Sequence, residues 1–535
     1  MDTTDNTDQQ EIEWQFDVED VNELRSWLAG DGSDLPVAVR ELPSRKLVDL
    51  YLDTEDQRLR RAGYSLRIRT TDGQVEATMK ALVASTDGVR KRREITEHIK
   101  QDGLRALQSS SGPVATRARL LAGRSSLQPL FQIRTRRLPF ELEVQGRALG
   151  ELTIDDSRFL LGDQPVHRLS RVEVELVPGG EEGQITRFVD RLRAEHRASV
   201  AVASKYETGL AAAGIADLTQ PDIGPTSHGD APTTGEVAYA VLRTQVLAIL
   251  KHEPGTRLGE DSEELHDMRV AIRRSRAAMS LFRDFLPPDV QRLREELGRV
   301  ARVLGEVRDL DVQIEQLAAW ERASGEGGGQ AFKPVRDILT ARRERARRRM
   351  VQVLDSRRYE RILTELQALL SRGPGDAPEA ASISIFETAP DLIQRRYRKL
   401  KRRGKNLNSS SPPEEYHELR INGKRLRYAL EFLRKVYGEP VQALIPPLTR
   451  LQDLLGAHQD AEVAMSQLAE MAAKRGKHLP PRTLFAMGGV AERYRTEAGQ
   501  LRKRFPSRFK KVRGRPWKHL RAELEARRPQ PPESV

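Results

Sequence analysis

Residues 266–276 have the sequence HDMRVAIRRSR, and residues 417–427 have the sequence HELRINGKRLR. These segments belong to a longer repeat, because residues 265–317 align with residues 416–468 at a constant offset of 151 without a gap. Of the 53 aligned positions, 17 are identical, and the register persists across a helix, a Pro-containing loop and a second helix. Unrelated helices of similar composition would rarely keep one register over that length, so the sequence indicates an internal duplication.

Each copy of the repeat places cations on one face of a helix. At 100° per residue, a histidine and three cations fall within an arc of about 80°. A solvated basic face would explain one such helix, but it would seldom repeat the same residues at identical spacings. An arc of cations without acidic partners repels itself, which favours a bound anion. The two arcs consist of His266, Arg269, Arg273 and Arg276 in the first copy and His417, Arg420, Lys424 and Arg427 in the second.

The sequence around the repeats is helical in pattern. Hydrophobic residues recur with a period of 3.6 in long segments that Gly and Pro clusters separate. The expected helical segments include 236–252, 260–286, 289–321 and 331–354. Basic runs at 341–350 and 394–405 are each typical of a solvated helix face. We therefore expect a C-terminal all-α duplicated helical bundle over residues 236–525, followed by a tail at 526–535.

The N-terminal part of the chain has a different hydrophobic period, close to two, which predicts β-strands. Asp-Gly pairs at 72–73 and 87–88 separate several of these segments, as in antiparallel hairpins. The expected strands span 11–18, 64–70, 74–82, 93–99, 138–144 and 171–177, with a helix at about 18–29. Residues 213–235 are rich in Gly, Pro, Ser and Thr and are expected to form a linker. We expect an antiparallel β-barrel or sandwich before it.

Charge is distributed unevenly along the chain, whose formal net charge is +12. Residues 1–220 contain 31 Lys and Arg against 36 Asp and Glu, which leaves 59 against 42 for the remainder. The positive field of the C-terminal part attracts nucleic acid, anionic lipid or another polyanion. Nucleic-acid modules usually interleave aromatic residues with basic ones for stacking on bases. Tyr428 is the only such ring near the arcs, so a ligand made of phosphate alone fits better than nucleic acid.

Composition also indicates where the protein is located. No stretch approaches 18 uninterrupted apolar residues, and the first ten residues, MDTTDNTDQQ, have neither a basic nor an apolar targeting region. The absence of cysteine excludes disulfides and agrees with a reducing compartment. We expect a cytoplasmic protein without a membrane partner.

The paired motifs HDMRVAIRRSR and HELRINGKRLR resemble those of the CHAD domain, a helical domain of two similar halves associated with inorganic polyphosphate. The resemblance covers about residues 236–525. It implies a basic surface or pore, lined by both copies, that holds a polyphosphate chain, and an association with polyphosphate granules. The implied polyphosphate-binding residues are His266, Arg269, Arg273, Arg274, Arg276, His417, Arg420, Lys424, Arg425, Arg427 and His458. The copies differ at His458, whose counterpart in the first copy is Val307.

The N-terminal part resembles the CYTH or triphosphate-tunnel family over residues 9–212. The resemblance rests on EIEWQ at 11–15, YLDTEDQRLRRAGYSLRIR at 51–69, Arg92 with Glu94, the ExE at 173–175 and SKY at 204–206. It implies an eight-stranded antiparallel barrel whose tunnel binds a triphosphate group with Mg²⁺ or Mn²⁺. The implied metal carboxylates are Glu11, Glu13, Asp155, Glu173 and Glu175. The implied triphosphate-binding cations are Arg67, Arg69, Lys80, Arg92, Arg137 and Lys205, with Arg136 as an alternative to Arg137.

One position departs from the family's opening motif, ExExK, because residue 15 is Gln. A glutamine can hydrogen-bond a phosphate or a water but brings no positive charge, which puts hydrolysis in doubt. The leading expectation is a protein whose barrel binds and hydrolyses a terminal triphosphate or polyphosphate end, while the helical half retains the polymer. The alternatives are a non-catalytic polyphosphate-binding or targeting protein, and an RNA-binding or RNA 5′-triphosphate-processing protein.

Overall fold

The computed structural model describes residues 7–18, 21–30, 36–100, 103–196, 198–323 and 328–529. The chain forms two compact units, which divide between Pro221 and Asp222. Residues 530–535 of the expected tail and residues 19–20 of the expected first helix lie outside the described residues. In the described part of the chain, no helix combines the length and the apolar character that a membrane crossing requires.

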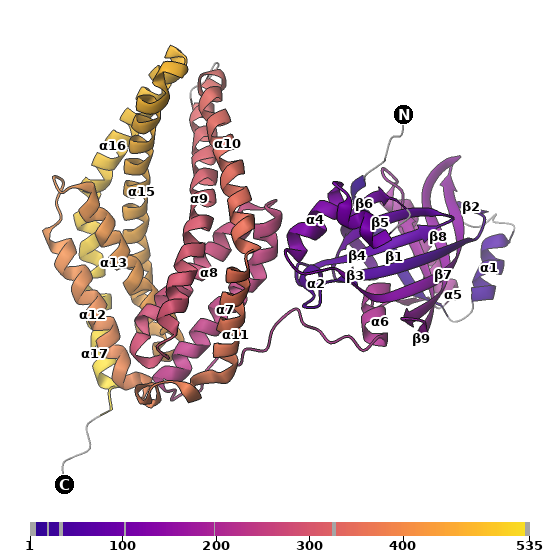
Figure 1. Cartoon of the computed structure of the whole chain (residues 1–535), viewed down its shortest axis with the longest axis horizontal. Coiled ribbons are helices and arrows are strands. Elements are labelled where there is room, and N and C mark those ends of the chain that lie inside the picture. Colours follow the sequence, from indigo (N-terminus) through magenta and orange to yellow (C-terminus); the bar gives the residue numbers. More distant parts are fainter. Residues whose placement is uncertain are drawn as a thin grey trace, which may run out of the picture. The chain divides into compact units, whose positions relative to one another are not determined.

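The first unit is a closed antiparallel barrel of eight strands (Figure 1). Around the ring the order is β1, β6, β5, β4, β3, β7, β8 and β9, and pairing of β9 with β1 closes it. The strands are β1 (Thr7–Asp17), β3 (Arg45–Asp53), β4 (Tyr64–Thr71), β5 (Gln74–Ala81), β6 (Val89–Ile99), β7 (Gln128–Val144), β8 (Arg147–Leu161) and β9 (Gln164–Leu176). Two short strands add to the ring, β2 (Ala38–Glu41) beside β7 and β10 (Ser199–Val200) beside β1. The predicted barrel is confirmed.

Strand β1 shows why the interior of the barrel is polar. Trp14 and Phe16 are buried in an apolar cluster with Leu24 of α1 (Val21–Ala29) and Phe188 of α5 (Glu182–His196). The alternate residues of β1 point to the opposite side, where Glu11, Glu13 and Gln15 are each only 3% exposed. Both faces of the strand are therefore covered, the apolar face by helices and the polar face by the barrel itself.

Shorter helices complete this unit. They are α2 (Arg58–Arg61), α3 (Gly103–Ser109), α4 (Pro113–Ala122) and α6 (Lys205–Ala212). Helix α6 begins with a capping box, in which the Ser204 hydroxyl accepts from the Glu207 backbone N–H and the Glu207 side chain accepts from the Ser204 backbone N–H. The capping box fixes the direction of the first residue of the helix, Lys205.

The second unit is helical, as predicted. Its helices are α7 (Thr234–Leu258), α8 (Ser262–Leu281), α9 (Val290–Ala323), α10 (Gly328–Leu354), α11 (Arg357–Arg372), α12 (Ile385–Asn406), α13 (Pro413–Phe432), α14 (Arg434–Tyr437), α15 (Glu439–Arg475), α16 (Pro481–Val512) and α17 (Arg515–Ala526). The expected segments 236–252, 260–286, 289–321 and 331–354 correspond to α7, α8, α9 and α10. Figure 1 shows α9 beside α10 and α15 beside α16 as two long helical hairpins.

The two copies of the repeat have the same order of elements. The first consists of α8, a short 3₁₀ turn η1 (Arg283–Phe285) and α9, and the second consists of α13, α14 and α15. Met268 and Ile272 of α8 and Leu419 and Leu426 of α13 are all fully buried in one hydrophobic core. Burial of the apolar stripe turns the cationic stripe of each helix away from that core.

Candidate functional site

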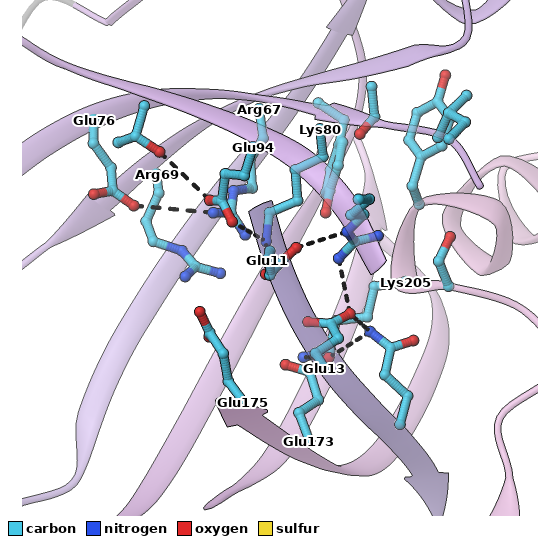
Figure 2. A pocket seen from close by; sticks show the side chains of 18 of the residues that line it. Glu11, Glu13, Arg67, Arg69, Glu76, Lys80, Glu94, Glu173, Glu175 and Lys205 are labelled. Carbon is cyan, nitrogen blue, oxygen red and sulfur yellow. Dashed lines mark hydrogen bonds and ion pairs between the residues drawn. The ribbon is translucent and has the colours of Figure 1, made fainter. Parts of the chain in front are cut away.

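A cavity of about 340 Å³ lies inside the barrel (Figure 2). Ten of the eleven residues that the sequence predicts for the barrel line it. They are Glu11 and Glu13 of β1, Arg67 and Arg69 of β4, Lys80 of β5, Arg92 of β6, Arg137 of β7, Glu173 and Glu175 of β9, and Lys205 of α6. Of the two alternatives in β7, Arg137 lines the cavity, whereas Arg136 is exposed on the other face of the strand.

One group of ion pairs surrounds Glu11. Its carboxylate accepts hydrogen bonds from Lys80 Nζ at 2.5 Å and from Arg92 Nε at 2.7 Å. Arg92 Nη2 also donates to Glu13 Oε1 at 2.8 Å, and Lys80 Nζ lies 3.1 Å from Glu94 Oε2. Burial alone would raise the pKa of Glu11, but the attraction of Lys80 and Arg92 outweighs it and holds that pKa well below its usual range.

A second group of ion pairs surrounds Asp155. Arg137 donates to both Asp155 oxygens, from Nε at 2.9 Å and from Nη2 at 2.7 Å, and Lys205 Nζ donates to Asp155 Oδ2. Both cations also reach Glu173, each at 3.0 Å. Asp155 is fully buried and does not line the cavity. Its position therefore suits holding Arg137 and Lys205 in place, and the metal role that the resemblance implies for it stays a prediction.

Glu13 and Glu175 lie directly opposite each other where β1 pairs with β9. Burial raises the pKa of Glu13 to about 7, since repulsion by Glu11 and Glu173 adds to it while Arg92 opposes it. Burial likewise raises the pKa of Glu175 to about 7, although this residue is among the more exposed ones that line the cavity. Repulsion comes from neighbouring carboxylates in both cases, from Glu11 and Glu173 on Glu13 and from Glu11 and Glu94 on Glu175.

Among the predicted metal carboxylates, Glu175 forms no ion pair within the described residues, whereas Glu13 pairs with Arg92 at 2.8 Å. Mg²⁺ is usually held by one or two protein carboxylates together with waters and substrate phosphates. In the described part of the chain, no group of three or more His, Asp or Glu side chains is arranged to enclose an ion. An ion bound here would therefore need phosphate oxygens and waters in addition to the cavity carboxylates, and the Mg²⁺ or Mn²⁺ ion stays a prediction.

Gln15 lies between two of the carboxylates. Its Nε2 donates to Glu13 Oε1 and, at 3.3 Å, to Glu173 Oε1. Its own Oε1 is buried without a hydrogen-bond partner. A neutral amide thus bridges the two carboxylates where a lysine would bring a charge, and an acceptor is left that a water or a hydroxyl could satisfy.

Several further residues, which the sequence did not predict, also line the cavity. They include Gln9, Tyr51, Ser65, Glu76, Glu94, Thr96, His98, Ser204 and Tyr206. The period of two predicts some of them. Glu94, Thr96 and His98 follow Arg92 at every second position of β6, so all four lie on one face of the strand. Asp49 of β3, which accepts from Arg69 at 2.7 and 2.8 Å, gives no comparable signal because its role depends on pairing between β3 and β4.

In the helical unit, the two cationic arcs meet. A hollow of about 680 Å³ and a second hollow of about 380 Å³ share the four residues Arg269, Arg273, Arg420 and Lys424. A third hollow of about 620 Å³ shares Asp309, Gln313 and Gln467 with the first. We call the three hollows together the central groove. The third hollow adds Arg342, Arg345 and Arg349 of α10 and Lys474 and Arg475 of α15.

Cations in the central groove are only partly paired. Arg269 lies 3.3 Å from Asp309 and Arg427 lies 3.4 Å from Glu431, and Asp453 and Asp460 also line the groove. Within the described residues, however, the buried Nε atoms of Arg273, Arg420 and Arg427 have no hydrogen-bond partner. Burial, together with the charges of Arg420, Arg273 and Arg269, lowers the pKa of Lys424 to about 7. Such crowding of cations that are only partly compensated is costly, and a polyanion in the groove would compensate for it.

Other predicted residues of the helical unit have different surroundings. Arg274 joins the two copies, because it pairs with Glu431 of α13 and its Nε donates to Gln245 Oε1 at 3.1 Å. Arg276 and Arg425 both line the 380 Å³ hollow, and Arg276 Nε also donates to the Arg294 carbonyl at 3.2 Å. His266 lines the 680 Å³ hollow.

The two remaining histidines do not line the central groove. His417 Nδ1 lies 2.7 Å from Gln459 Oε1. His458 is 1% exposed, its ring lies against Tyr416, and its Nε2 accepts from Arg502 Nε at 2.9 Å. Burial, together with Arg502, lowers the pKa of His458. The structure therefore does not bring His458 together with the arcs.

Comparison with protein families matches residues 9–207 to the CYTH domain and residues 240–469 to the CHAD domain. A comparison with curated proteins found no match. Among solved structures, PptA from Streptomyces chartreusis is 24% identical with a TM-score of 0.44, over 52% of this chain and 99% of that chain. The CHAD domain from the plant Ricinus communis is 24% identical with a TM-score of 0.41, over 57% and 97%. HpAC1 from Hippeastrum, described as having a dominant triphosphatase activity, is 17% identical with a TM-score of 0.28, over 38% and 95%.

Proposed function

We propose that this chain, which is a CYTH domain followed by a CHAD domain, binds inorganic polyphosphate and hydrolyses its terminal phosphoryl group. In this proposal the barrel takes the terminal triphosphate, and the central groove retains the polymer. The observation that carries it is the convergence of six Arg and Lys side chains with carboxylates in one cavity of about 340 Å³ inside a closed barrel.

Binding in the barrel is supported by the kind and placement of the cations. Arginine binds phosphate oxygens bidentately, and charge-assisted hydrogen bonds are roughly twice as strong as neutral ones. Among the described residues, Arg67 contacts carboxylates only at long range, at 3.9 Å to both Asp49 and Glu76, and its buried Nε has no hydrogen-bond partner. A phosphate oxygen would therefore satisfy Arg67 without breaking a strong ion pair.

Hydrolysis would draw on the carboxylates. Glu13 and Glu175 would hold the Mg²⁺ or Mn²⁺ ion, which supplies charge neutralisation to the phosphate oxygens when bound. Another carboxylate of the cavity, which does not hold the ion, would orient the attacking water and accept its proton. The water oxygen forms a bond to the terminal phosphorus, the bond to the bridging oxygen breaks, and the shortened chain leaves with the electron pair.

Retention of the polymer is supported by the unpartnered donors of the central groove. Arg273, Arg420 and Arg427 each have a buried Nε without a partner, and Lys424 is destabilised as a cation. Among the residues that line the groove, the aromatic ones are Tyr428 and Phe432, which are 4% and 6% exposed. Buried rings offer no face for stacking on bases, which disfavours single-stranded RNA as the ligand.

A second candidate function is non-catalytic binding, and Gln15 favours it. Its amide already bridges Glu13 and Glu173 without adding charge. In this alternative the barrel binds a triphosphate end without cleaving it.

The test is phosphate release by the full chain with Mg²⁺ or Mn²⁺ across tripolyphosphate, nucleoside triphosphates, thiamine triphosphate and long polyphosphate. We expect release by the wild type and its loss in the Glu173→Gln, Glu175→Gln double variant. The exposed Glu55 lies outside the cavity, so Glu55→Gln serves as the control. Binding without release would favour the non-catalytic candidate, and absence of both would contradict the proposal.

A further inference from the structure

A second concentration of cations lies in the helical unit and shares no lining residue with the central groove. It is a pocket of about 650 Å³ formed by residues of α12, α16 and α17 and the turns beside them. Its cations are Lys405, Lys510, Arg513, Arg515 and Lys518, and no Asp or Glu lines it. We call it the α12–α17 pocket.

The floor of the α12–α17 pocket is apolar and closely packed. Phe505 and Phe509 of α16 line it, and they are 1% and 4% exposed. Gly404 permits this packing, because a Cβ at that position would lie 2.3 Å from the Phe509 ring. The pocket is therefore a hollow with a fixed apolar floor and a cationic rim.

The cations of the rim are not compensated. In the described part of the chain, no ion pair joins Lys405, Lys510 or Lys518 to a carboxylate, and Arg513 lies over the Phe509 ring at 5.5 Å. The sequence adds no acid nearby, because residues 394–405 contain eight Lys and Arg and residues 501–521 contain ten, without Asp or Glu in either segment. Mutual repulsion of this kind favours a multivalent anion.

We propose that the α12–α17 pocket is a second phosphate-binding site, which engages a polyphosphate chain that the central groove already holds. This inference rests on the proposed function. Helix α12 connects the two sites, because Arg396 lines the central groove and Lys405 lines the pocket. Nine residues of helix span about 14 Å along the axis and turn through about 900°, so Arg396 and Lys405 lie on opposite faces of α12. A long chain that passes around α12 can reach both sites, whereas three phosphates are too few.

The chemistry of the pocket favours phosphate over nucleobases. Its aromatic rings are buried in the floor, so a base would find no free ring face on which to stack. Its lysines act as point charges without the planar fork of arginine, which suits a flexible chain of phosphates. A chain tethered in the central groove would reach the pocket at high effective concentration, so long polyphosphate gains most from the second site.

The test compares two triple variants of the full chain with the same change in charge. The first replaces Lys405, Lys510 and Lys518 of the pocket with Gln. The control replaces Lys399, Lys503 and Lys511 with Gln, which are exposed on α12 and α16 and line none of the hollows described. Affinity for long polyphosphate and for tripolyphosphate is measured for each variant at several salt concentrations, and affinity for RNA and for acidic lipid vesicles is measured at one of them.

We expect the pocket triple variant to bind long polyphosphate about tenfold more weakly than the control triple variant does. Its slope of log affinity against log salt should be smaller by about 2 to 3, since each phosphate contact contributes roughly 0.7 to 0.9 to the slope in nucleic acids. Affinity for tripolyphosphate should stay unchanged in both variants.

Equal weakening in both triple variants would overturn the inference, because it would show a diffuse field instead of a site. Unchanged binding of long polyphosphate in the pocket variant would also overturn it. Selective loss of RNA or of acidic lipid vesicles, with polyphosphate unaffected, would assign the pocket to those ligands and overturn it too. A wild type that fails to bind long polyphosphate would instead contradict the proposed function on which the inference rests.

Discussion

Lys424 should act as a proton acceptor when polyphosphate binds. In the ligand-free protein, burial and the neighbouring arginines lower its pKa to about 7, whereas its ordinary value is 10.5. A phosphate chain in the central groove favours the ammonium form, so binding raises the pKa and the protein takes up a proton from the buffer. The perturbation that isolates this effect is Lys424→Arg, because an arginine stays charged with and without ligand.

The expected magnitude depends on pH. If binding restores the ordinary pKa, the wild type should take up about 0.9 proton at pH 8, where the free lysine is about one-tenth protonated. At pH 6 the free lysine is already charged, and the uptake from Lys424 should fall to about 0.1 proton. Protons exchanged by other groups or by the polyphosphate itself should be similar in the wild type and the variant, so the difference between the two proteins reports on Lys424.

The assay is calorimetry of polyphosphate binding in two buffers that differ in ionisation enthalpy, at constant salt, from pH 6 to pH 9. The slope of the observed heat against the buffer enthalpy gives the number of protons taken up. We expect the wild type to exceed Lys424→Arg by about 0.9 proton at pH 8. Equal uptake by the two proteins across this range, with binding retained in both, would refute the assignment of Lys424 to the phosphate path.

Three further predictions concern the barrel and the packing of the helices. Affinity of the barrel for Mg²⁺ or Mn²⁺ in the presence of tripolyphosphate should rise from pH 6 to pH 8, because Glu13 and Glu175 lose their protons near pH 7; a metal titration with Glu175→Gln should show a smaller rise than the wild type, since Glu13 and tripolyphosphate still lose protons in this range. Gln15→Lys should increase the rate of phosphate release in a steady-state assay. An ammonium between Glu13 and Glu173 adds a charge-assisted contact that strengthens as charge develops in the transition state. An unchanged rate would count against this role of a cation at position 15. Gly404→Ala should lower the free energy of unfolding by about 1 to 3 kcal/mol in urea, because its Cβ would overlap the Phe509 ring.

Much of the barrel could be predicted from its sequence, because strand alternation separates two faces of every strand. The alternation of EIEWQF does not say which face points inward, and only closure of the ring, with β9 paired to β1, decides it. Strands β3 and β8 were not among the expected strands. The pairing of Asp155 with Arg137 and Lys205 joins residues from two strands and a helix, so it has no local signature in the sequence.

The helices of the second unit and their duplication could be predicted from the sequence, whereas the surroundings of the binding residues could be predicted only in part. Apolar positions decide which face of α8 and of α13 is buried, so the arcs point away from the core as expected. His458 differs, because a partner from a distant helix, Arg502, encloses it together with Tyr416. Nothing within the basic runs at 341–350 and 394–405 predicts that their cations do more than face the solvent. Packing of α10 against α9 and of α12 against α17 brings some of their cations into the hollows.

The most direct test of the account is equilibrium binding of long polyphosphate to the full chain and to two double variants. Each variant replaces two arginines with glutamine, one in each copy of the repeat, at positions that correspond between the copies. Arg269→Gln with Arg420→Gln removes equivalent cations from the central groove, and Arg283→Gln with Arg434→Gln removes equivalent exposed cations outside it. We predict that the groove variant binds at least about tenfold more weakly and with a shallower salt dependence, while the control variant binds like the wild type. Equal affinity of both variants, or displacement of polyphosphate by RNA of the same charge concentration, would contradict the account.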